Sequence, residues 1–215
     1  MHKRLVILGG GESGVGTAIL ARKKGFEVFV SDFGKMKEKY KKVLLHHEIE
    51  WEEGKHTVSK VLSAEIVMKS PGIPDNVPIV LKLKEAGVRV LSEIEFASRF
   101  TNALIVGITG SNGKTTTATL TYAILKQAGL KVALGGNIGE SFAAQVLGDE
   151  YESFVLELSS FQLDGIETFA PHIAVLMNLS PDHLDRYDNS YQKYIASKFR
   201  IIMKQTEDDY FIYDG

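Results

Sequence analysis

Residues 105–117 constrain the fold of this chain more than any other segment, because an apolar run leads into a glycine-rich loop and then into a helical pattern. In such a strand, loop and helix unit, glycines let backbone N–H groups turn toward phosphate oxygens, and the helix N-terminus adds positive potential. Lys114 can neutralise the terminal phosphates, and the Thr115 hydroxyl can ligate magnesium. The segment therefore predicts a site for a nucleoside triphosphate, with ATP as the expected ligand. The predicted loop comprises Gly110, Ser111, Asn112, Gly113, Lys114, Thr115 and Thr116.

This loop departs by one residue from the common phosphate-loop spacing. That spacing has a glycine five residues before Gly113, where this chain has Ile108 between glycines at positions 107 and 110. Strand, loop, Lys-Thr pair and helix still follow in the required order. We therefore favour a phosphate loop over a plain glycine-rich turn with an exposed lysine.

Length and composition limit the remaining possibilities. A chain of 215 residues suits two domains of about 100 residues each. A formal charge of -2 gives no reason to expect a nucleic acid partner, and the absence of cysteine excludes disulfides and thiolate metal sites. The apolar run at residues 5–8 is too short for a signal peptide, and no segment reaches the ~20 apolar residues of a membrane span. We expect a cytoplasmic protein without a membrane partner.

Short apolar runs alternate with helical patterns along the whole chain, which predicts an α/β fold with parallel sheets. We expect a Rossmann-like domain over residues 1–101, followed by a P-loop NTPase-like α/β domain over residues 102–215. The chain stops directly after a strand-like run at 210–213, so we expect it to be a fragment with a truncated second domain. The predicted strands are 4–8, 27–31, 66–69, 88–91, 104–108, 131–134, 154–158, 173–177 and 210–213. The predicted helices are 13–24, 78–86, 92–100, one after the phosphate loop and one around 191–203.

The first domain carries a second glycine motif, Gly9-x-Gly11-x-x-Gly14, between a strand and a helix. Asp32 ends the next strand, which completes the pattern of a dinucleotide fingerprint. The direct inference is a nucleotide with a diphosphate, and two alternatives remain open: an NAD-dependent oxidoreductase, and glycines that serve only the fold. The turn at residues 70–74 follows another strand, where a ligand crevice is expected.

Polar residues also follow strands in the second domain. Glu157 ends an apolar strand, where a carboxylate is costly to bury unless it is paired with a metal or a cation. His183 follows the next strand between Asp182 and Asp185; imidazole suits manganese better than magnesium, so Mn²⁺ is an alternative to Mg²⁺. Asn137 follows a further strand and offers both a donor and an acceptor. From residue chemistry alone, ordinary structural roles stay open for all three, and the histidines at 2, 46, 47, 56 and 172 are expected to be surface or packing residues.

Four segments together closely resemble the Mur ligases of peptidoglycan synthesis: residues 107–116, 135–139, 156–163 and 178–187. The similarity extends over essentially the whole chain, and it includes the unusual loop spacing. It implies an ATP-dependent enzyme of three domains, of which this sequence holds the first and part of the second. The implied partners are UDP-N-acetylmuramoyl-L-alanine, ATP and D-glutamate, whose own site falls mostly outside this sequence, and the expected state is a monomer.

The resemblance also implies roles for individual residues. Lys114, His183 and Lys198 would be catalytic, with Lys198 carried as a carbamate whose negative charge supports a second metal. Glu12 and Ser13 stand where relatives vary, and the Phe33-Gly34 pair lacks the polar residues that some relatives have there, so the resemblance does not specify the details of uridine contact. The implied substrate contacts are Gly11, Glu12, Ser13, Gly14, Asp32, Ser70, Pro71, Gly72, Ile73, Asn137, Ser159, Gln162 and His183. The implied metal ligands are Thr115, Glu157, His183 and the modified Lys198.

The implied reaction joins D-glutamate to the alanyl carboxylate through an acyl phosphate. Three other functions remain open: a sister ligase that adds a different amino acid, a nicotinamide oxidoreductase, and a phosphate-loop switch protein. We expect the 215-residue chain alone to bind the UDP-linked substrate weakly and not to ligate.

Overall fold

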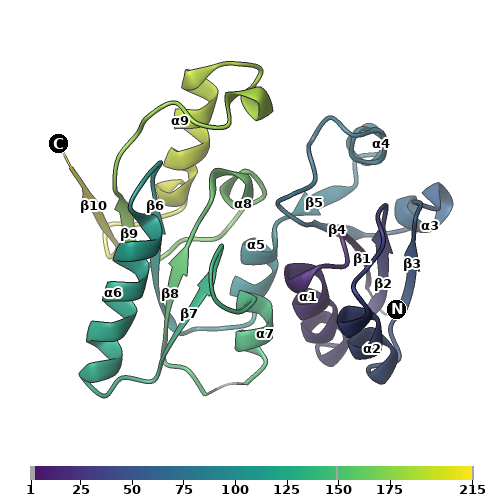
Figure 1. The fold of residues 1–215 in the computed structure, drawn as a ribbon, viewed down its shortest axis with the longest axis horizontal. Coiled ribbons are helices and arrows are strands. Elements are labelled where there is room, and N and C mark those ends of the chain that lie inside the picture. Colours follow the sequence, from purple (N-terminus) through teal and green to yellow (C-terminus); the bar gives the residue numbers. More distant parts are fainter. Residues whose placement is uncertain (1–2, 149, 215) are drawn as a thin grey trace.

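The strands of the described residues form two five-stranded parallel sheets, and each sheet has helices packed against it (Figure 1). The structure is a computed structural model that describes residues 3–148 and 150–214. The first sheet has the strand order β3-β2-β1-β4-β5, and the second has the order β10-β9-β6-β8-β7. Every strand pair is parallel, which confirms the predicted fold class of two α/β units. His2 and Gly215, which entered the predictions above, lie outside the described residues.

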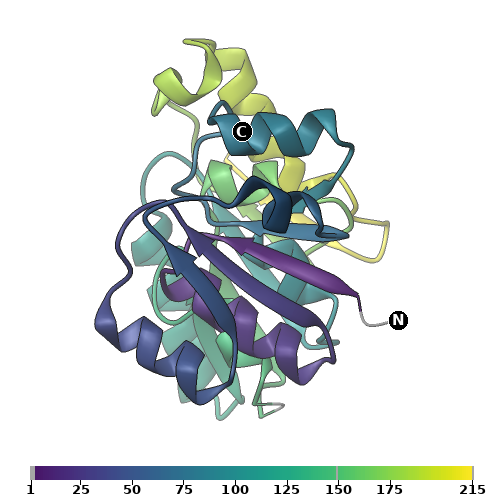
Figure 2. The same cartoon turned by 90° about the vertical axis from the view of Figure 1, so that its right-hand side faces the viewer.

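The first domain alternates strands and helices from its first residues. Figure 2 brings it to the front, with β1 and β2 side by side in register. Gly25 and Gly87 follow the C-terminal ends of two helices with positive φ angles of 83° and 68°, as expected for helix caps. The elements are β1 (Arg4–Leu8), α1 (Glu12–Lys23), β2 (Glu27–Asp32), α2 (Glu38–His46), β3 (Glu50–Glu53), α3 (Val58–Leu62), β4 (Ile66–Lys69), α4 (Pro78–Glu85), β5 (Arg89–Leu91) and α5 (Glu93–Ser98).

The second domain begins with the strand that precedes the phosphate loop. The predicted boundary at residues 101–102 falls between α5 and this strand. The elements are β6 (Leu104–Thr109), α6 (Lys114–Gln127), β7 (Val132–Gly136), α7 (Phe142–Val146), β8 (Ser153–Glu157), α8 (Ser160–Asp164), β9 (Ile173–Leu176), the 3₁₀ turn η1 (Leu184–Tyr187), α9 (Tyr191–Phe199), the 3₁₀ turn η2 (Arg200–Ile202) and β10 (Tyr210–Tyr213).

The two domains share a packed interface made by α1, α5 and α7, which lie between the sheets (Figure 1). Gly16 of α1 faces α7 so closely that a Cβ at this position would lie 2.1 Å from the Ser141 hydroxyl oxygen. Glu93 of α5 is fully buried and accepts hydrogen bonds from the Ser141 hydroxyl at 2.5 Å and the Ala143 N–H at 3.0 Å. The start of α7 is therefore fixed to the first domain.

A second buried carboxylate of α5 fixes another part of the second domain. Glu95 accepts backbone N–H bonds from Glu167, Thr168 and Phe169 at 2.8–2.9 Å, and it also pairs with Arg99. Burial alone would raise the pKa of Glu95, but these hydrogen bonds outweigh burial and hold the pKa below its usual value. The carboxylate is therefore ionised and fully paired at neutral pH.

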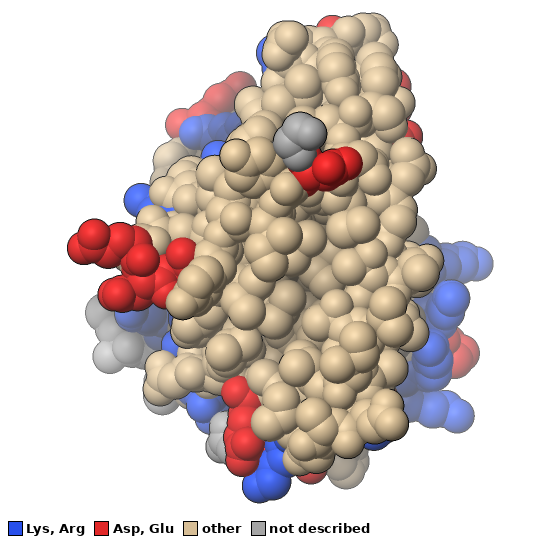
Figure 3. Space-filling view, turned by 90° about the vertical axis from the view of Figure 1, so that its left-hand side faces the viewer, with Lys and Arg blue, Asp and Glu red and all other residues tan. Residues whose placement is uncertain are grey.

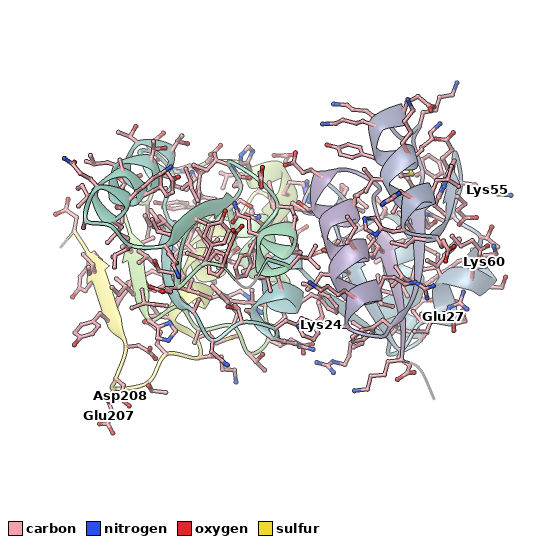
Figure 4. The ribbon with its side chains drawn as sticks, turned by 90° about the horizontal axis from the view of Figure 1, so that it is seen from below. Lys24, Glu27, Lys55, Lys60, Glu207 and Asp208 are labelled. Atoms are coloured by element: carbon pink, nitrogen blue, oxygen red, sulfur yellow. The ribbon has the colours of Figure 1, made fainter. Side chains whose placement is uncertain are left out.

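The outer end of the second domain carries little charge. β10 is an edge strand, and its side chains Tyr210, Ile212 and Tyr213 are exposed, as are Leu120 and Ile124 of α6. Figure 3 views this side, and few acidic or basic residues interrupt it. The charged Glu207 and Asp208 lie at this end, opposite Lys55 and Lys60 at the far end of the first domain (Figure 4). Within the two described ranges, no helix combines the length and apolar character that a bilayer crossing needs.

Candidate functional site

The glycine motif of the first domain forms a tight turn at the carboxyl end of β1. Gly9 has φ +95°, a conformation that strains other residues, and a Cβ at Gly14 would lie 1.9 Å from the Gly9 carbonyl oxygen. A Cβ at Gly11, by contrast, would have no described atom within 4 Å, and Gly11 precedes α1 without any side-chain cap. Gly9 and Gly14 therefore build the turn, while Gly11 leaves its backbone open to a ligand.

Asp32 holds this turn in place from the end of β2. One carboxylate oxygen accepts the Gly10 N–H at 2.7 Å, and the other accepts the Gly34 N–H at 2.8 Å. Each oxygen keeps a further lone pair for a sugar hydroxyl. Ser70 closes the other side, where its hydroxyl lies 3.4 Å from the Gly9 carbonyl oxygen. The glycine motif, Asp32 and the turn that begins at Ser70 were each predicted at a strand's carboxyl end, and they lie together at one edge of the sheet.

A mainly apolar pocket of about 530 Å³ opens beside this turn. Asp32 and Gly9 form one wall, and Gly72 and Ile73 of the predicted turn form another. Its complete lining is Gly9, Asp32, Phe33, His56, Val58, Gly72, Ile73, Pro74, Val77, Pro78, Ile79 and Lys82. Six other predicted residues of this domain do not line it: Gly11, Glu12, Ser13, Gly14, Ser70 and Pro71.

Two lining residues were not predicted as site residues. His56 was expected to be a surface or packing residue, and Phe33 was noted only as a departure from relatives. Phe33 is 73% exposed, and its ring lies 5.7 Å from the His56 ring. His56 follows β3, an edge strand that the sequence did not reveal, because Glu50-Trp-Glu-Glu53 lacks the apolar run of a typical strand.

The phosphate loop of the second domain lies between β6 and α6, as predicted. Gly110 and Gly113 have φ +147° and +81°. The Lys114 ammonium donates to the carbonyl oxygens of Gly110 at 2.9 Å and Ser111 at 3.0 Å, so its side chain lies over the loop. Asn112 exchanges two hydrogen bonds with Asn178 after β9. The loop is thus fixed to the neighbouring strand end, while Thr115 and Thr116 at the start of α6 are exposed.

Glu157 is the centre of a polar network beneath this loop. It is 2% exposed, and its two carboxylate oxygens accept from the Thr115 hydroxyl at 2.7 Å and the Asn137 amide at 2.9 Å. Three residues predicted from separate strand ends therefore lie together. A hydroxyl and a carboxylate oxygen side by side are the hard oxygen ligands that magnesium prefers.

Lys198 of α9 reaches the same loop from its other side. Its ammonium group donates to Gly110 O at 3.0 Å and to the Thr109 hydroxyl at 3.2 Å. Burial, followed by the positive charge of Lys114, lowers its pKa to about 8. Two lysines thus share the Gly110 carbonyl oxygen as an acceptor, and Lys198 has substantial neutral amine character near physiological pH.

His183 has a different setting from the other predicted residues. It adopts a left-handed backbone conformation with φ 49°, its side chain is 57% exposed, and its ring lies 5.3 Å from Phe161. The described contacts link it to neither Glu157 nor Lys198. Nearby, Arg186 lies over the Phe161 ring and reaches the carbonyl oxygens of Pro71 and Ile73 in the first domain. The loop that carries His183 is thereby joined to the turn of the first pocket.

Ser159 and Gln162 form a capping box at the start of α8. The Ser159 hydroxyl accepts the Gln162 N–H, and the Gln162 side-chain oxygen accepts the Ser159 N–H. Gln162 is buried at 1% exposure. Both side chains are thus occupied in positioning α8 in this structure.

The described residues contain no cluster of three or more His, Cys, Asp or Glu that could hold a metal. The predicted ligand set contains only two such residues, Glu157 and His183, so the absence of a larger cluster does not bear on it. The residues present do suit a magnesium ion, because Thr115 Oγ1 and Glu157 Oε2 lie 2.7 Å apart beneath the phosphate loop.

Two parallel sheets, each with a glycine-rich loop that opens a helix, define a two-domain α/β protein of the phosphate-loop class. Two family models match the chain: the Mur ligase middle domain over residues 108–214 and the MurD N-terminal domain over residues 4–77. The chain therefore belongs to the Mur ligase family, as the sequence motifs predicted.

Curated relatives agree with this membership. The chain is 63% identical over 215 residues to the UDP-N-acetylmuramoylalanine–D-glutamate ligase of Christiangramia forsetii, and the match covers 100% of the chain and 48% of the relative. It is 57% identical over 211 residues to the protein of that name from Bacteroides fragilis, covering 98% and 48%. The chain thus spans about half the length of these relatives.

Solved structures support the fold. The UDP-N-acetylmuramate:L-alanyl-γ-D-glutamyl-meso-diaminopimelate ligase of Neisseria meningitides aligns with a TM-score of 0.67 at 21% identity, over 100% of this chain and 72% of that one. The UDP-N-acetylmuramate–alanine ligase of Thermotoga maritima aligns with a TM-score of 0.56 at 20% identity, over 93% and 47%. At these identities the likeness concerns the fold alone.

Proposed function

We propose that this chain is the substrate-binding and ATP-binding part of a ligase that adds D-glutamate to UDP-N-acetylmuramoyl-L-alanine in peptidoglycan precursor synthesis. The names of the curated relatives support the substrates, and the two glycine-rich loops support two nucleotide sites. The protein would act as a monomer in the cytoplasm, where ATP and nucleotide-linked sugars are available.

In this proposal the first domain binds the UDP part of the substrate. Gly11 and the open N-terminus of α1 would receive the diphosphate, because free N–H groups and the helix dipole favour anions there. Asp32 would accept a ribose hydroxyl, and the turn at residues 70–73 would border the base. Glu12, Ser13 and Gly14 would shape the start of α1 around the diphosphate. Asn137, His183 and the α8 cap of Ser159 and Gln162 would face the muramoyl-alanine end.

The second domain would bind ATP through the loop from Gly110 to Thr116. Lys114 would exchange its contacts with Gly110 O and Ser111 O for the β- and γ-phosphate oxygens. Thr115, Glu157 and His183 would hold magnesium, for which manganese could substitute. The bound metal would supply charge neutralisation between the triphosphate and the incoming carboxylate.

Lys198 fits the proposed carbamate. An amine with a pKa of about 8 is partly neutral near pH 7.5 and can therefore add to carbon dioxide. The product is an anion, which would be attracted to Lys114 where the ammonium form is repelled by it. The modification would thus convert an unfavourable lysine pair into a favourable ion pair.

The proposed chemistry has two steps. An oxygen of the alanyl carboxylate attacks the γ-phosphorus of ATP, the bond to the bridging oxygen breaks, and ADP leaves. The D-glutamate amine then attacks the acyl carbon, the bond to phosphate breaks, and the amine loses a proton as the amide forms. Lys114 stabilises charge on the transferred phosphoryl group, and Asn137 and His183 orient the carboxylate toward it.

One observation carries this proposal: the Thr115–Glu157–Asn137 network. It joins the phosphate loop to the residue expected to touch the muramoyl peptide, so a carboxylate beside Asn137 lies near the end of the triphosphate. The bridge from Arg186 to the turn at residues 71–73 extends this arrangement to the first pocket.

Calorimetric titration of the 215-residue chain tests the substrate site. We expect weak binding of UDP-N-acetylmuramoyl-L-alanine, weaker binding of UDP, and none of NAD. The full-length protein should release phosphate only when D-glutamate is added with that substrate and ATP. NAD binding would favour the oxidoreductase, and phosphate release that depends on another amino acid would favour a sister ligase. Slow ATP hydrolysis without an acceptor would favour a switch protein. Each of these results contradicts the proposal.

A further inference from the structure

The pocket beside the first glycine turn is lined by a histidine with one ring nitrogen that makes no hydrogen bond to the described residues. His56 lines this pocket, and its Nδ1 lies 2.7 Å from the Ser31 hydroxyl oxygen. Its Nε2 has no hydrogen-bond partner among the described residues. Two other polar side chains line the pocket: the Asp32 carboxylate, which already accepts two backbone N–H groups, and Lys82, which is exposed. His56 is therefore the group best placed to recognise a polar edge in an otherwise apolar pocket.

Neighbouring hydrogen bonds fix the tautomer of this ring. The Ser31 hydroxyl also lies 2.7 Å from Glu52 Oε1, and Glu52 accepts two further bonds from Thr57. Burial alone would raise the pKa of Glu52, but the bonds from Thr57 and Ser31 outweigh burial and hold the pKa below its usual value. An ionised carboxylate only accepts, so the single Ser31 proton goes to Glu52.

The Ser31 oxygen must then accept from His56, which places the imidazole proton on Nδ1. The ring itself stays neutral, because burial lowers the pKa of His56 more than Glu52 and Asp32 raise it. In a neutral ring with its proton on Nδ1, Nε2 is an acceptor with a free lone pair. The pocket thus offers a fixed hydrogen-bond acceptor and no donor at this position.

We propose that His56 selects the base of the nucleotide, with Nε2 accepting the N3–H of uracil. Uracil carries a hydrogen at N3, whereas cytosine carries a lone pair there, so cytosine would place two acceptors against each other. This inference rests on the proposed function, because the UDP-linked substrate comes from it. It adds the residue that distinguishes uracil from cytosine.

Phe33 completes the recognition of the base. Its ring is largely exposed at the pocket wall, 5.7 Å from the His56 ring and inclined to it by 38°. An exposed aromatic face beside a fixed acceptor suits a planar base, which can stack on the ring and direct its edge to the histidine.

Binding of UDP and CDP to the 215-residue chain and its variants tests the inference by calorimetry. We expect the wild type to prefer UDP by about tenfold or more, since an unpaired buried acceptor is costly. His56→Ala should weaken UDP binding about three- to tenfold and leave CDP nearly unchanged. His56→Gln should restore UDP binding and strengthen CDP binding, because an amide can turn to offer either an acceptor or a donor. His46→Ala, an exposed histidine of α2 outside the pocket, is the matched control.

A second measurement is independent of the affinities. Nitrogen NMR shifts of His56 in the free chain should report a proton on Nδ1, and Ser31→Ala should release this preference and lower the UDP-to-CDP ratio. A proton on Nε2 in the wild type, or an unchanged ratio in His56→Ala with normal UDP binding, overturns the inference and leaves the proposed function intact. Failure of the wild type to bind either UDP or its UDP-linked substrate overturns both.

Discussion

The two glycine-rich loops of this molecule end parallel strands in the same way, but they differ in how they prepare for a ligand. The loop of the first domain leaves Gly11 open beside a preformed pocket. The loop of the second domain is occupied by its own side chains, because Lys114 and Lys198 both donate to the Gly110 carbonyl oxygen. In the second domain a triphosphate must therefore replace internal hydrogen bonds, whereas the first site needs no exchange.

The same strand, loop and helix topology thus serves two different purposes in the two domains. The first site supplies shape and a few fixed polar atoms, which determine which nucleotide fits. The second supplies charge and mobile donors, which can follow the phosphoryl group as its charge develops. Substitutions should therefore act on binding in the first domain and on catalysis in the second.

Lys114→Ala should produce the largest effect. In the full-length protein we expect turnover to fall by about three orders of magnitude or more, since Lys114 supplies the positive charge of the loop that stabilises the transferred phosphoryl group. Binding of the UDP-linked substrate, measured by calorimetry, should survive. Lys126→Ala, an exposed lysine at the other end of α6, is the control. Near-normal turnover in Lys114→Ala would remove the contrast between the two loops.

Two glycine substitutions separate the structural role of the first loop from its role in ligand binding. Gly14→Ala should lower the free energy of unfolding by about 3 kcal/mol, because its Cβ would overlap the Gly9 carbonyl oxygen. Gly11→Ala should change stability by no more than about 0.5 kcal/mol but weaken UDP binding, because its methyl group enters the open approach. Denaturant unfolding and calorimetry measure the two effects. Equal stability losses in both variants would show that Gly11 also belongs to the packed turn.

The last prediction concerns the pH dependence of stability. The pKa of Lys198 is lowered from 10.5 to about 8 in the folded chain, so between these values the unfolded chain binds more protons. Its contribution to the free energy of unfolding should therefore rise with pH from about 8 to 10.5. Lys198→Met should reduce this rise in bicarbonate-free buffer, while Lys193→Met on the same helix should not. A wild type without the rise would mean that Lys198 is already modified or is less buried than described.

The sequence predicted the second site better than the first pocket. Lys114, Thr115, Glu157 and Asn137 each follow a strong apolar strand, and parallel strands bring their carboxyl ends to one edge of the sheet. Chain order and strand direction therefore sufficed to predict their proximity. The contact of Lys198 with the loop could not be predicted from spacing, since it depends on how α9 packs.

His56 and Phe33 were missed for a related reason. His56 is placed by β3, whose sequence Glu-Trp-Glu-Glu has the charge of a loop, and which forms a strand because it pairs with β2 at the sheet edge. Tertiary pairing overrode local propensity here. The domain boundary and the roles assigned to individual site residues remain predictions.

The two carboxylates of α5 have a consequence for how the molecule unfolds. Glu93 and Glu95 belong to the helix that ends the first domain, yet they accept hydrogen bonds from Ser141 and Glu167 of the second domain. One buried apolar cluster also runs through both domains, from Leu5 to Ile201. Unfolding one domain alone would remove the hydrogen-bond partners of these carboxylates and expose apolar surface of the other domain to water. The two domains should therefore unfold as one cooperative unit. Scanning calorimetry should show a single heat-absorption peak, where two independently unfolding domains would give two.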